Sequence, residues 1–232
     1  MLRHPHIRLL VVLAAGALAL SGCSGSGDLP TAVLARLRAR TPPPAPAPSP
    51  DSPTSLVRLF AWCWNHRDIE RYREIFTDDY RFAFAITDSA GDAYRDVPWT
   101  REDELISVEH IFDDAASITL VFAGDLQAEP DYREGKTLPW HQTVHVPYLT
   151  LTIVWKDGSS FQATGGALFY VVRGDSAAIP QELLERGFTP DPTRWYIERW
   201  EDQTAIRGTA MTPARTAPAR RVTWGDVKVL YR

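Results

Sequence analysis

Acid–base chemistry needs carboxylates, histidines or tyrosines held close together, and the sequence supplies all three residue types. Several carboxylates fall at the ends of expected helices, where capping and solvation explain them: Asp78, Asp79, Asp113 and Asp114. The other candidates qualify by residue type alone: His110, His141, His145, Tyr80 and Tyr148. A histidine or aromatic residue on a strand more often packs than catalyses, so the sequence assigns no catalytic residue.

Metal and thiol chemistry find little support in the sequence. His141 and His145 would lie about 13 Å apart on one face of a strand, too far apart to bind one metal ion. The chain has two cysteines, and the apolar stretch around Cys63 predicts a buried and inert thiol. We therefore expect no metal and no cofactor.

The other cysteine, Cys23, is placed for acylation. Arg3 and Arg8 give the N-terminal residues a positive charge, and an uncharged apolar run over residues 9–20 follows them. This run is shorter than the roughly 20 residues that a helix needs to cross a bilayer. It ends in Leu20-Ser21-Gly22-Cys23, which resembles the lipobox of bacterial lipoproteins. An ordinary secretory peptide that is cleaved nearby is the alternative.

The lipobox resemblance implies a signal peptide over residues 1–22 and acylation of Cys23, whose acyl chains would anchor the protein in the membrane. Ser24 after the cysteine favours the outer membrane over the inner one. We therefore expect a lipid-anchored protein of the bacterial cell envelope.

Residues 23–53 are expected to be a tether between the lipid and a folded domain. Seven of the thirteen residues from 41 to 53 are proline. This proline density excludes helix and sheet and favours an extended polyproline spacer of roughly 40 Å. Such a tether would hold the domain clear of the membrane.

A folded domain is expected over residues 54–204, and three helices come first. Ser55 is the expected cap of the first helix, whose apolar face is formed by Leu56, Leu59, Phe60, Cys63 and Trp64. Asp68 is the expected cap of a second helix over residues 69–76. Thr100 and Asp103 form a capping-box pattern at the start of a third helix, whose apolar residues are Leu105, Ile106, Val108 and Phe112.

The remaining segments of this domain are rich in β-branched and aromatic residues, which predicts strands. One strand precedes the third helix, in DYRFAFAI, and four follow it, in ASITLVFAG, HQTVHVPYLTLTIVWKDG, SSFQATGGALFYVVRG and RWYIERWEDQT. KDGS is typical of a tight hairpin turn, and Gly165 and Gly166 predict a bulge or bend within a strand. Helices followed by long hairpins predict an α+β domain with the helices on one face of a curved sheet.

The order of these elements and several of their residues resemble the nuclear transport factor two-like superfamily. The leading helix pair and the first strand match its D…Y…LF.DDY.F pattern, and the last strand matches its W.I..W.D pattern. The matching residues are Asp68, Tyr72, Ile75, Phe76, Asp78, Asp79, Tyr80, Phe82, Trp195, Ile197, Trp200 and Asp202. The resemblance covers nearly all of residues 55–204.

This resemblance implies a cone-shaped domain: a strongly curved antiparallel sheet wrapped around about three N-terminal helices, with an apolar pocket inside. The superfamily includes ketosteroid isomerase, scytalone dehydratase and many non-catalytic members. The isomerase takes a tyrosine from its first helix, where this chain has Trp62 and Trp64. We therefore expect a non-catalytic cone that binds an apolar small molecule or an envelope protein. The alternative is an isomerase or dehydratase that uses a carboxylate or histidine in the cone. A third possibility is a structural module whose cone is filled by its own side chains.

The expected lining of the cone pocket is mostly aromatic. The lining residues are Trp64, Tyr72, Tyr80, Phe82, Phe84, His145, Tyr148 and Trp155. His145 and Tyr148 flank Pro147, where regular strand pairing should be interrupted, and this places them near the mouth. The other aromatic residues of this set should share one core with Phe60, Leu149, Leu151 and Ile153.

The domain and the tail over residues 205–232 carry net charges of opposite sign. Residues 54–204 hold 14 Lys and Arg against 26 Asp and Glu, a net charge of −12, whereas the tail carries +5. An acidic domain argues against nucleic acid as a partner. The tail is expected to begin as a flexible basic stretch, and its apolar residues 222–231 to dock on the domain. Expected partners are the membrane through acylated Cys23, an apolar small molecule, and a second copy or an envelope protein.

Overall fold

The computed structural model describes residues 45–86, 88, 90–94, 96–205 and 219–231. The expected signal peptide, Cys23, the tether up to residue 44 and the tail over residues 206–218 lie outside these ranges. The chain divides after Ala45 into two units, and every element named below belongs to the second. Within the described residues, none of the helices is both long enough and apolar enough to cross a membrane.

Three helices precede or interrupt the strands, as the sequence predicts. They are α2 (Pro53–His66), α3 (Ile69–Arg73) and α4 (Arg101–Asp114). Asp68 caps α3, and Thr100 forms a reciprocal capping box with Asp103 at the start of α4. These two caps are confirmed.

The first cap was expected at Ser55, and this expectation is wrong. The cap is Ser52, whose hydroxyl oxygen accepts a hydrogen bond from the backbone N–H of Ser55. Pro53 explains the earlier start, because proline is well suited to the first helical position, where no N–H is needed. The second helix ends at Arg73 rather than at residue 76, because Phe76 already belongs to the first strand.

One eight-stranded sheet carries the rest of the domain. Its strands are β1 (Phe76–Ala83), β2 (Trp99–Thr100), β3 (Ala115–Ala123), β4 (Gln127–Pro130), β5 (His141–Trp155), β6 (Ser160–Arg173), β7 (Trp195–Thr204) and β8 (Arg220–Arg221). Six of them follow the order β2-β1-β7-β6-β5-β3, while β4 pairs with β5 and β8 with β6. Neighbouring strands are antiparallel except β1 with β7 and β6 with β8.

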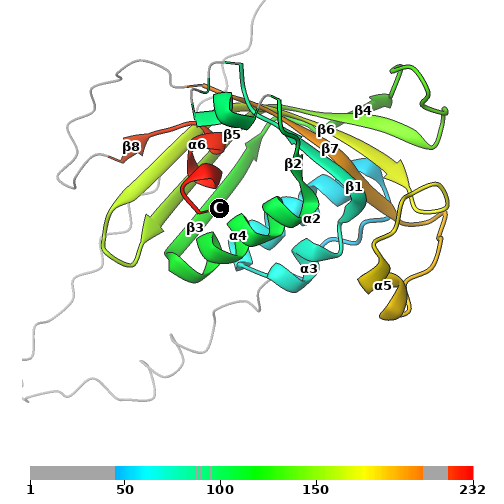
Figure 1. Cartoon of the computed structure of the whole chain (residues 1–232), viewed down its shortest axis with the longest axis horizontal. Coiled ribbons are helices and arrows are strands. Elements are labelled where there is room, and N and C mark those ends of the chain that lie inside the picture. Colours follow the sequence, from blue (N-terminus) through cyan, green and yellow to red (C-terminus); the bar gives the residue numbers. More distant parts are fainter. Residues whose placement is uncertain (1–44, 87, 89, 95, 206–218, 232) are drawn as a thin grey trace, which may run out of the picture. The chain divides into compact units, whose positions relative to one another are not determined.

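The sheet curves around the helices, which lie together on one of its faces (Figure 1). A break in the β5–β6 register between Val146 and Leu149 lies opposite the glycine pair, as the sequence predicts. Gly165 has a φ of +149°, and a Cβ there would lie 2.5 Å from the carbonyl oxygen of Gln203. Glycine is therefore needed where β7 approaches β6 at this bend.

Helices and sheet enclose one main hydrophobic core. It unites Phe60, Trp64, Tyr72, Tyr80, Phe82, Leu149, Leu151, Ile153 and Trp155, and Phe84 packs against its border. The aromatic sets expected to meet in the cone therefore do meet. Ile106 was expected on the apolar face of the third helix, but its side chain is 39% exposed.

The end of the chain returns to the core through α6 (Trp224–Val229), which begins with a capping box between Thr223 and Asp226. Val222, Trp224 and Val227 are almost completely buried. Figure 1 shows α6 beside α4 and near the 3₁₀-helix η1 (Ala90–Tyr94), on the helix side of the sheet. The remaining helix, α5 (Gln181–Glu185), lies between β6 and β7 in the sequence.

Candidate functional site

Glu104 is a fully buried carboxylate on the inner face of α4. The buried residues of this helix recur at intervals of three and four: Arg101, Glu104, Leu105, Ser107, Val108, Ile111 and Phe112. Glu104 therefore belongs to the stripe that faces the sheet. The period of the helix therefore places Glu104 inside the cone.

Three donors from α3, β1 and β2 surround this carboxylate. The hydroxyl of Tyr72 donates to Oε1 at 2.7 Å, and the hydroxyl of Tyr80 donates to Oε2 at 3.2 Å. The indole N–H of Trp99 also donates to Oε2, at 3.2 Å. Burial first, and then the charge of Glu104, raise the pKa of both tyrosines well above the ordinary value.

The fourth donor is Lys228, which α6 carries into the cone. Its ammonium group bonds to Oε2 of Glu104, and neither side chain has any exposed surface. Nζ also lies 3.7 Å from the ring centroid of Phe82 and 3.8 Å from that of Trp200. The lysine is thus held by a carboxylate and by the faces of two aromatic rings, an arrangement that attracts a cation electrostatically.

Burial also shifts the pKa values of Lys228 and of Asp202, a carboxylate beside the pair. Burial lowers the pKa of Lys228 to about 8, although the attraction of Glu104 opposes the fall. Burial raises the pKa of Asp202 to about 6, while hydrogen bonds from Thr204 and Gly225 oppose the rise. Taking charges out of water therefore carries a cost at this site that the contacts only partly recover.

Four polar contacts hold α6 and its cap residue Thr223 against the rest of the domain. The N–H of Gly225 donates to Asp202 at 3.1 Å, and the N–H of Trp224 donates to the Thr204 hydroxyl at 2.9 Å. The Thr223 hydroxyl donates to Asp88 at 2.9 Å. The Ser107 hydroxyl donates to the carbonyl of Lys228 at 2.9 Å. These contacts fix the depth to which α6 enters the cone.

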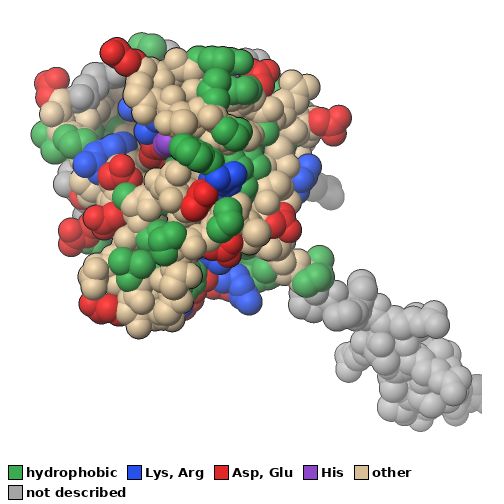
Figure 2. Space-filling model, turned by 90° about the vertical axis from the view of Figure 1, so that its right-hand side faces the viewer, with side chains coloured by type: hydrophobic (Ala, Val, Ile, Leu, Met, Phe, Trp, Pro, Cys, Tyr) green, Lys and Arg blue, Asp and Glu red, His purple; other side chains and the backbone are tan. Residues whose placement is uncertain are grey.

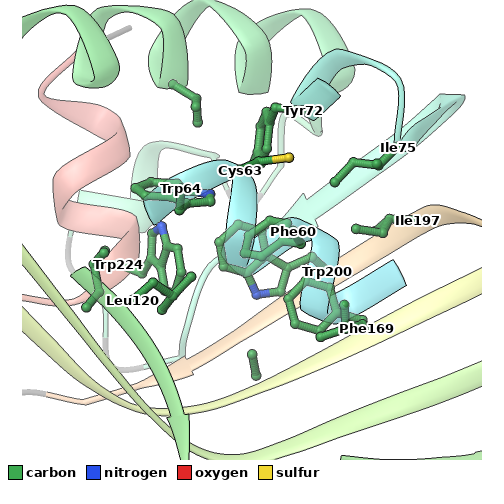
Figure 3. Close-up of a cluster of buried hydrophobic side chains, with 14 of the residues drawn as sticks. Phe60, Cys63, Trp64, Tyr72, Ile75, Leu120, Phe169, Ile197, Trp200 and Trp224 are labelled. Atoms are coloured by element: carbon green, nitrogen blue, oxygen red, sulfur yellow. The ribbon is translucent and has the colours of Figure 1, made fainter. Parts of the chain in front are cut away.

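Trp224 fills an aromatic chamber at the centre of the core. Its ring centroid lies 4.7 Å from that of Trp200, 4.9 Å from that of Trp64 and 6.0 Å from that of Phe60. Figure 3 shows Trp224 extending from α6 toward Trp64, with Phe60 and Trp200 beside them. The side chains of α6 therefore occupy the interior of the cone.

Hollows on the surface border this filled interior. One of about 450 Å³ is lined by Phe82, Phe84 and Tyr94 together with charged side chains. Another of about 650 Å³ mixes arginines with acidic residues and lies along α4. Phe82 lines the first hollow and also contacts Lys228.

The structure brings together most of the residues that the sequence placed in the pocket. Tyr72, Tyr80 and Phe82 surround Glu104 and Lys228, and Trp64 contacts Trp224. Trp155 stacks on Tyr231 with ring centroids 4.9 Å apart, and Phe84 stacks on Tyr94 at 5.3 Å. Contacts of this set thus reach Trp224, Lys228 and Tyr231 of the C-terminal segment.

His145 and Tyr148 lie elsewhere. Both side chains are exposed, and they alternate on β5 with the buried residues Val144, Val146 and Leu149. They therefore face away from the buried cluster, on the outer side of the sheet. The break in pairing beside Pro147 is present, but it does not turn them inward.

Sequence reasoning missed Glu104, Lys228, Trp99 and Trp200 as members of this cluster. Charged residues were interpreted as caps or solvated groups, and the tail was expected to dock on the domain but was not assigned to the pocket. A signal was nevertheless present, because Glu104 lies four residues before Val108 and Lys228 lies four residues after Trp224. Both positions share a helix face with apolar residues.

Neither a metal site nor a reactive thiol appears among the described residues. No group of three or more histidine, cysteine or acidic side chains in the described part of the chain could hold a metal ion. Cys63 is buried, as expected, and burial raises the pKa of its thiol well above the ordinary range. This thiol is therefore protonated and inert at neutral pH.

No protein-family model matches the sequence, and a search of curated proteins finds no relative. Solved structures with a similar arrangement include a nuclear transport factor 2-like superfamily protein from Salmonella enterica, at 12% identity, over 69% of this chain and 94% of that one, with a TM-score of 0.43. A protein with a cystatin-like fold from Caulobacter vibrioides matches at 14% identity, over 65% and 85%, with a TM-score of 0.43. A conserved protein from Planctomyces limnophilus matches at 12% identity, over 65% and 91%, with a TM-score of 0.44.

Proposed function

We propose that this protein is a lipid-anchored, non-catalytic binding module of the bacterial cell envelope, and that its cone takes up an apolar small molecule where α6 lies. One observation carries the proposal: Trp224 fills a chamber lined by Phe60, Trp64 and Trp200. An apolar cavity lined by aromatic side chains is the usual form of a small-molecule site. The end of the chain thus takes the position of a ligand.

The state of Glu104 favours binding over catalysis. A general acid or base must lie within hydrogen-bond reach of the substrate. Glu104 has no exposed surface, and its carboxylate already accepts bonds from Tyr72, Tyr80, Trp99 and Lys228. A reactant would have to displace Lys228 before it could reach this carboxylate.

Uptake of N-phenyl-1-naphthylamine, a neutral apolar probe that fluoresces when buried, tests the proposal. We expect the full-length chain with Cys23→Ala, which removes the acylation site, to bind this probe. Trp224→Ala should bind it more tightly, because the change empties the chamber. The matched control is Leu230→Ala, whose side chain is 58% exposed and should leave probe binding unchanged. Equal affinity in all three proteins, or no uptake by any, would contradict the proposal.

An acid–base enzyme is the second candidate, and one observation favours it. A buried carboxylate that faces two tyrosine hydroxyls is a common arrangement for proton transfer to or from a carbonyl compound. If the cone opens and catalyses, steroid ketones or dehydratable polyketides should be converted, and Glu104→Gln should abolish the activity. We expect no conversion of either substrate class by the wild-type chain.

The sequence before the domain supports the anchoring part of the proposal. The lipobox pattern at Cys23 provides the acylation site, and the proline-rich tether provides reach. The end of the tether joins the domain at Pro50, whose carbonyl accepts a hydrogen bond from the N–H of Trp195 at 2.8 Å. The folded unit would thus begin close to the end of the spacer.

A further inference from the structure

We infer that the cone is a cation-binding site whose ligand is an amphiphilic amine, a molecule with an apolar body and a protonated amino group. This inference rests on the proposed function, because it names the chemistry of the molecule that replaces α6. In the structure, Lys228 supplies the amino group and Trp224 supplies the apolar body. Each has a receptor built from other elements.

The receptor for the amino group contains no residue of α6. Its carboxylate is Glu104 of α4, and its two rings are Phe82 of β1 and Trp200 of β7. Aromatic faces combined with a carboxylate are how proteins recognise alkylammonium groups. This receptor would keep its components if α6 left the cone.

The carboxylate is also held in position independently of Lys228. Tyr72, Tyr80 and Trp99 donate to it from α3, from β1 and from β2. If a neutral molecule replaced α6, it would leave Glu104 as a buried carboxylate with no cation beside it, which is strongly unfavourable. Charge complementarity therefore favours a replacing molecule that brings a positive charge over a neutral molecule of the same shape.

The receptor for the apolar body lies beside the receptor for the amino group. The Trp200 ring contacts both parts, since its centroid lies 4.7 Å from that of Trp224 and 3.8 Å from Nζ of Lys228. Phe60 and Trp64 complete the aromatic side. A ligand with a ring and an amino group on a short carbon chain would match both parts at once.

Several features make α6 replaceable. It has six residues, too few for a helix to be stable without its packing. Its docking removes Lys228 and Glu104 from water. In many buried ion pairs the attraction between the charges does not offset the free-energy cost of this desolvation. The indole N–H groups of Trp200 and Trp224 are buried and find no acceptor among the residues that the structure describes. The hollow lined by Phe82 and Phe84 reaches the edge of this site.

Two matched probes test the inference on the full-length chain with Cys23→Ala: phenethylamine and its neutral counterpart 2-phenylethanol. We expect calorimetry to give phenethylamine an affinity at least about tenfold higher, which corresponds to about 1.4 kcal/mol. Phenethylamine should also speed amide hydrogen exchange in residues 224–229. Glu104→Gln should abolish the preference, whereas Glu109→Gln, at an exposed position of the same helix, should retain it.

A second variant keeps the test decisive if α6 outcompetes the probes. Lys228→Ala leaves a space that n-butylamine can fill, so n-butylamine should raise the melting temperature of this variant and 1-butanol should not. If the neutral member of either pair acts as well as the amine, the inference is overturned while the proposed uptake of apolar molecules stands. If no probe binds the wild-type chain but n-butylamine stabilises Lys228→Ala, the cation site stands and the proposed uptake fails. If no probe acts on either protein, both fail.

Discussion

The pair formed by Glu104 and Lys228 dominates the chemistry of this protein at the scale of single residues. Both groups are completely buried, and both rings that face the ammonium belong to the aromatic core. A buried ion pair is weak evidence for stability, because its desolvation cost often exceeds the attraction gained. We therefore interpret the pair as a recognition feature of the cone.

This pair predicts an unusual dependence of stability on pH. Burial lowers the pKa of Lys228 from 10.5 to about 8, with Glu104 of α4 and Asp202 of β7 as the charged groups beside it. Between these pH values the unfolded chain binds the lysine proton more tightly than the folded chain, so the free energy of unfolding rises with pH. About 2 kcal/mol of this rise should accrue between pH 8 and pH 9.5. The raised pKa of the Cys63 thiol opposes part of this rise within the same range, and measurements should stop at pH 9.5 because the raised pKa values of Tyr72 and Tyr80 add to the opposing effect at higher pH.

Urea unfolding from pH 7.5 to pH 9.5 measures this rise. Lys228→Met should flatten the curve, because it removes the group whose pKa is shifted. Lys156→Met, at an exposed lysine in the β5–β6 turn, is the control and should keep the wild-type slope. An unchanged slope in Lys228→Met would show that other groups cause the dependence.

At this scale the sequence predicted the aromatic part of the site but not its charges. Tyr72, Tyr80 and Phe82 follow from helical and strand periods, so their meeting in one core could be predicted. Glu104 and Lys228 lie 124 residues apart in the chain. Only the docking of α6 brings them together, and the apolar residues of the tail predict that it docks but not that it enters the cone.

At the scale of elements, local signals determine most helix starts. Asp68 and Thr100 were predicted as caps because an acidic or hydroxyl side chain precedes an apolar period, and both were confirmed. The first helix shows the limit of this reasoning, since two serines precede its apolar face. Pro53 decides between them, because it favours the cap one residue before itself.

A pair of serine variants tests that assignment. Ser52→Ala should lower the free energy of unfolding by about 1 kcal/mol, because it removes the oxygen that accepts from the Ser55 N–H. Ser55→Ala keeps this N–H and should change stability much less. Urea unfolding of both variants at one pH gives the comparison. A larger loss in Ser55→Ala would return the cap to the position expected from the sequence.

At the scale of the whole molecule, the end of the chain closes the cone, and the proposed lipid anchor lies near the other end of the sequence. The α+β class and the curved sheet could be predicted, because the helices come first and long hairpins follow. Anchoring, the outer-membrane location and association with a second copy stay predictions. On the face drawn in Figure 2, apolar side chains form separate patches between charged ones.

Anchoring is tested by detergent phase partition of the protein expressed in a bacterium. The wild-type chain should enter the detergent phase and incorporate labelled fatty acid, because acylated Cys23 carries several apolar chains. Cys23→Ala should move to the aqueous phase and lose the label, whereas Cys63→Ala should behave like the wild type. Label that survives in Cys23→Ala would contradict the lipobox interpretation.

Native-state hydrogen exchange of α6 tests the central claim most directly, because the claim requires α6 to leave the cone while the sheet stays folded. We predict that amides of residues 224–229 exchange through an opening whose free energy is lower than that of global unfolding, which the amides of β5 and β6 report. Denaturant should affect the exchange of α6 less steeply than that of the sheet, because a local opening exposes less surface. If α6 and the sheet instead exchange with the same free energy and the same denaturant dependence, α6 is a permanent part of the core and the account is wrong.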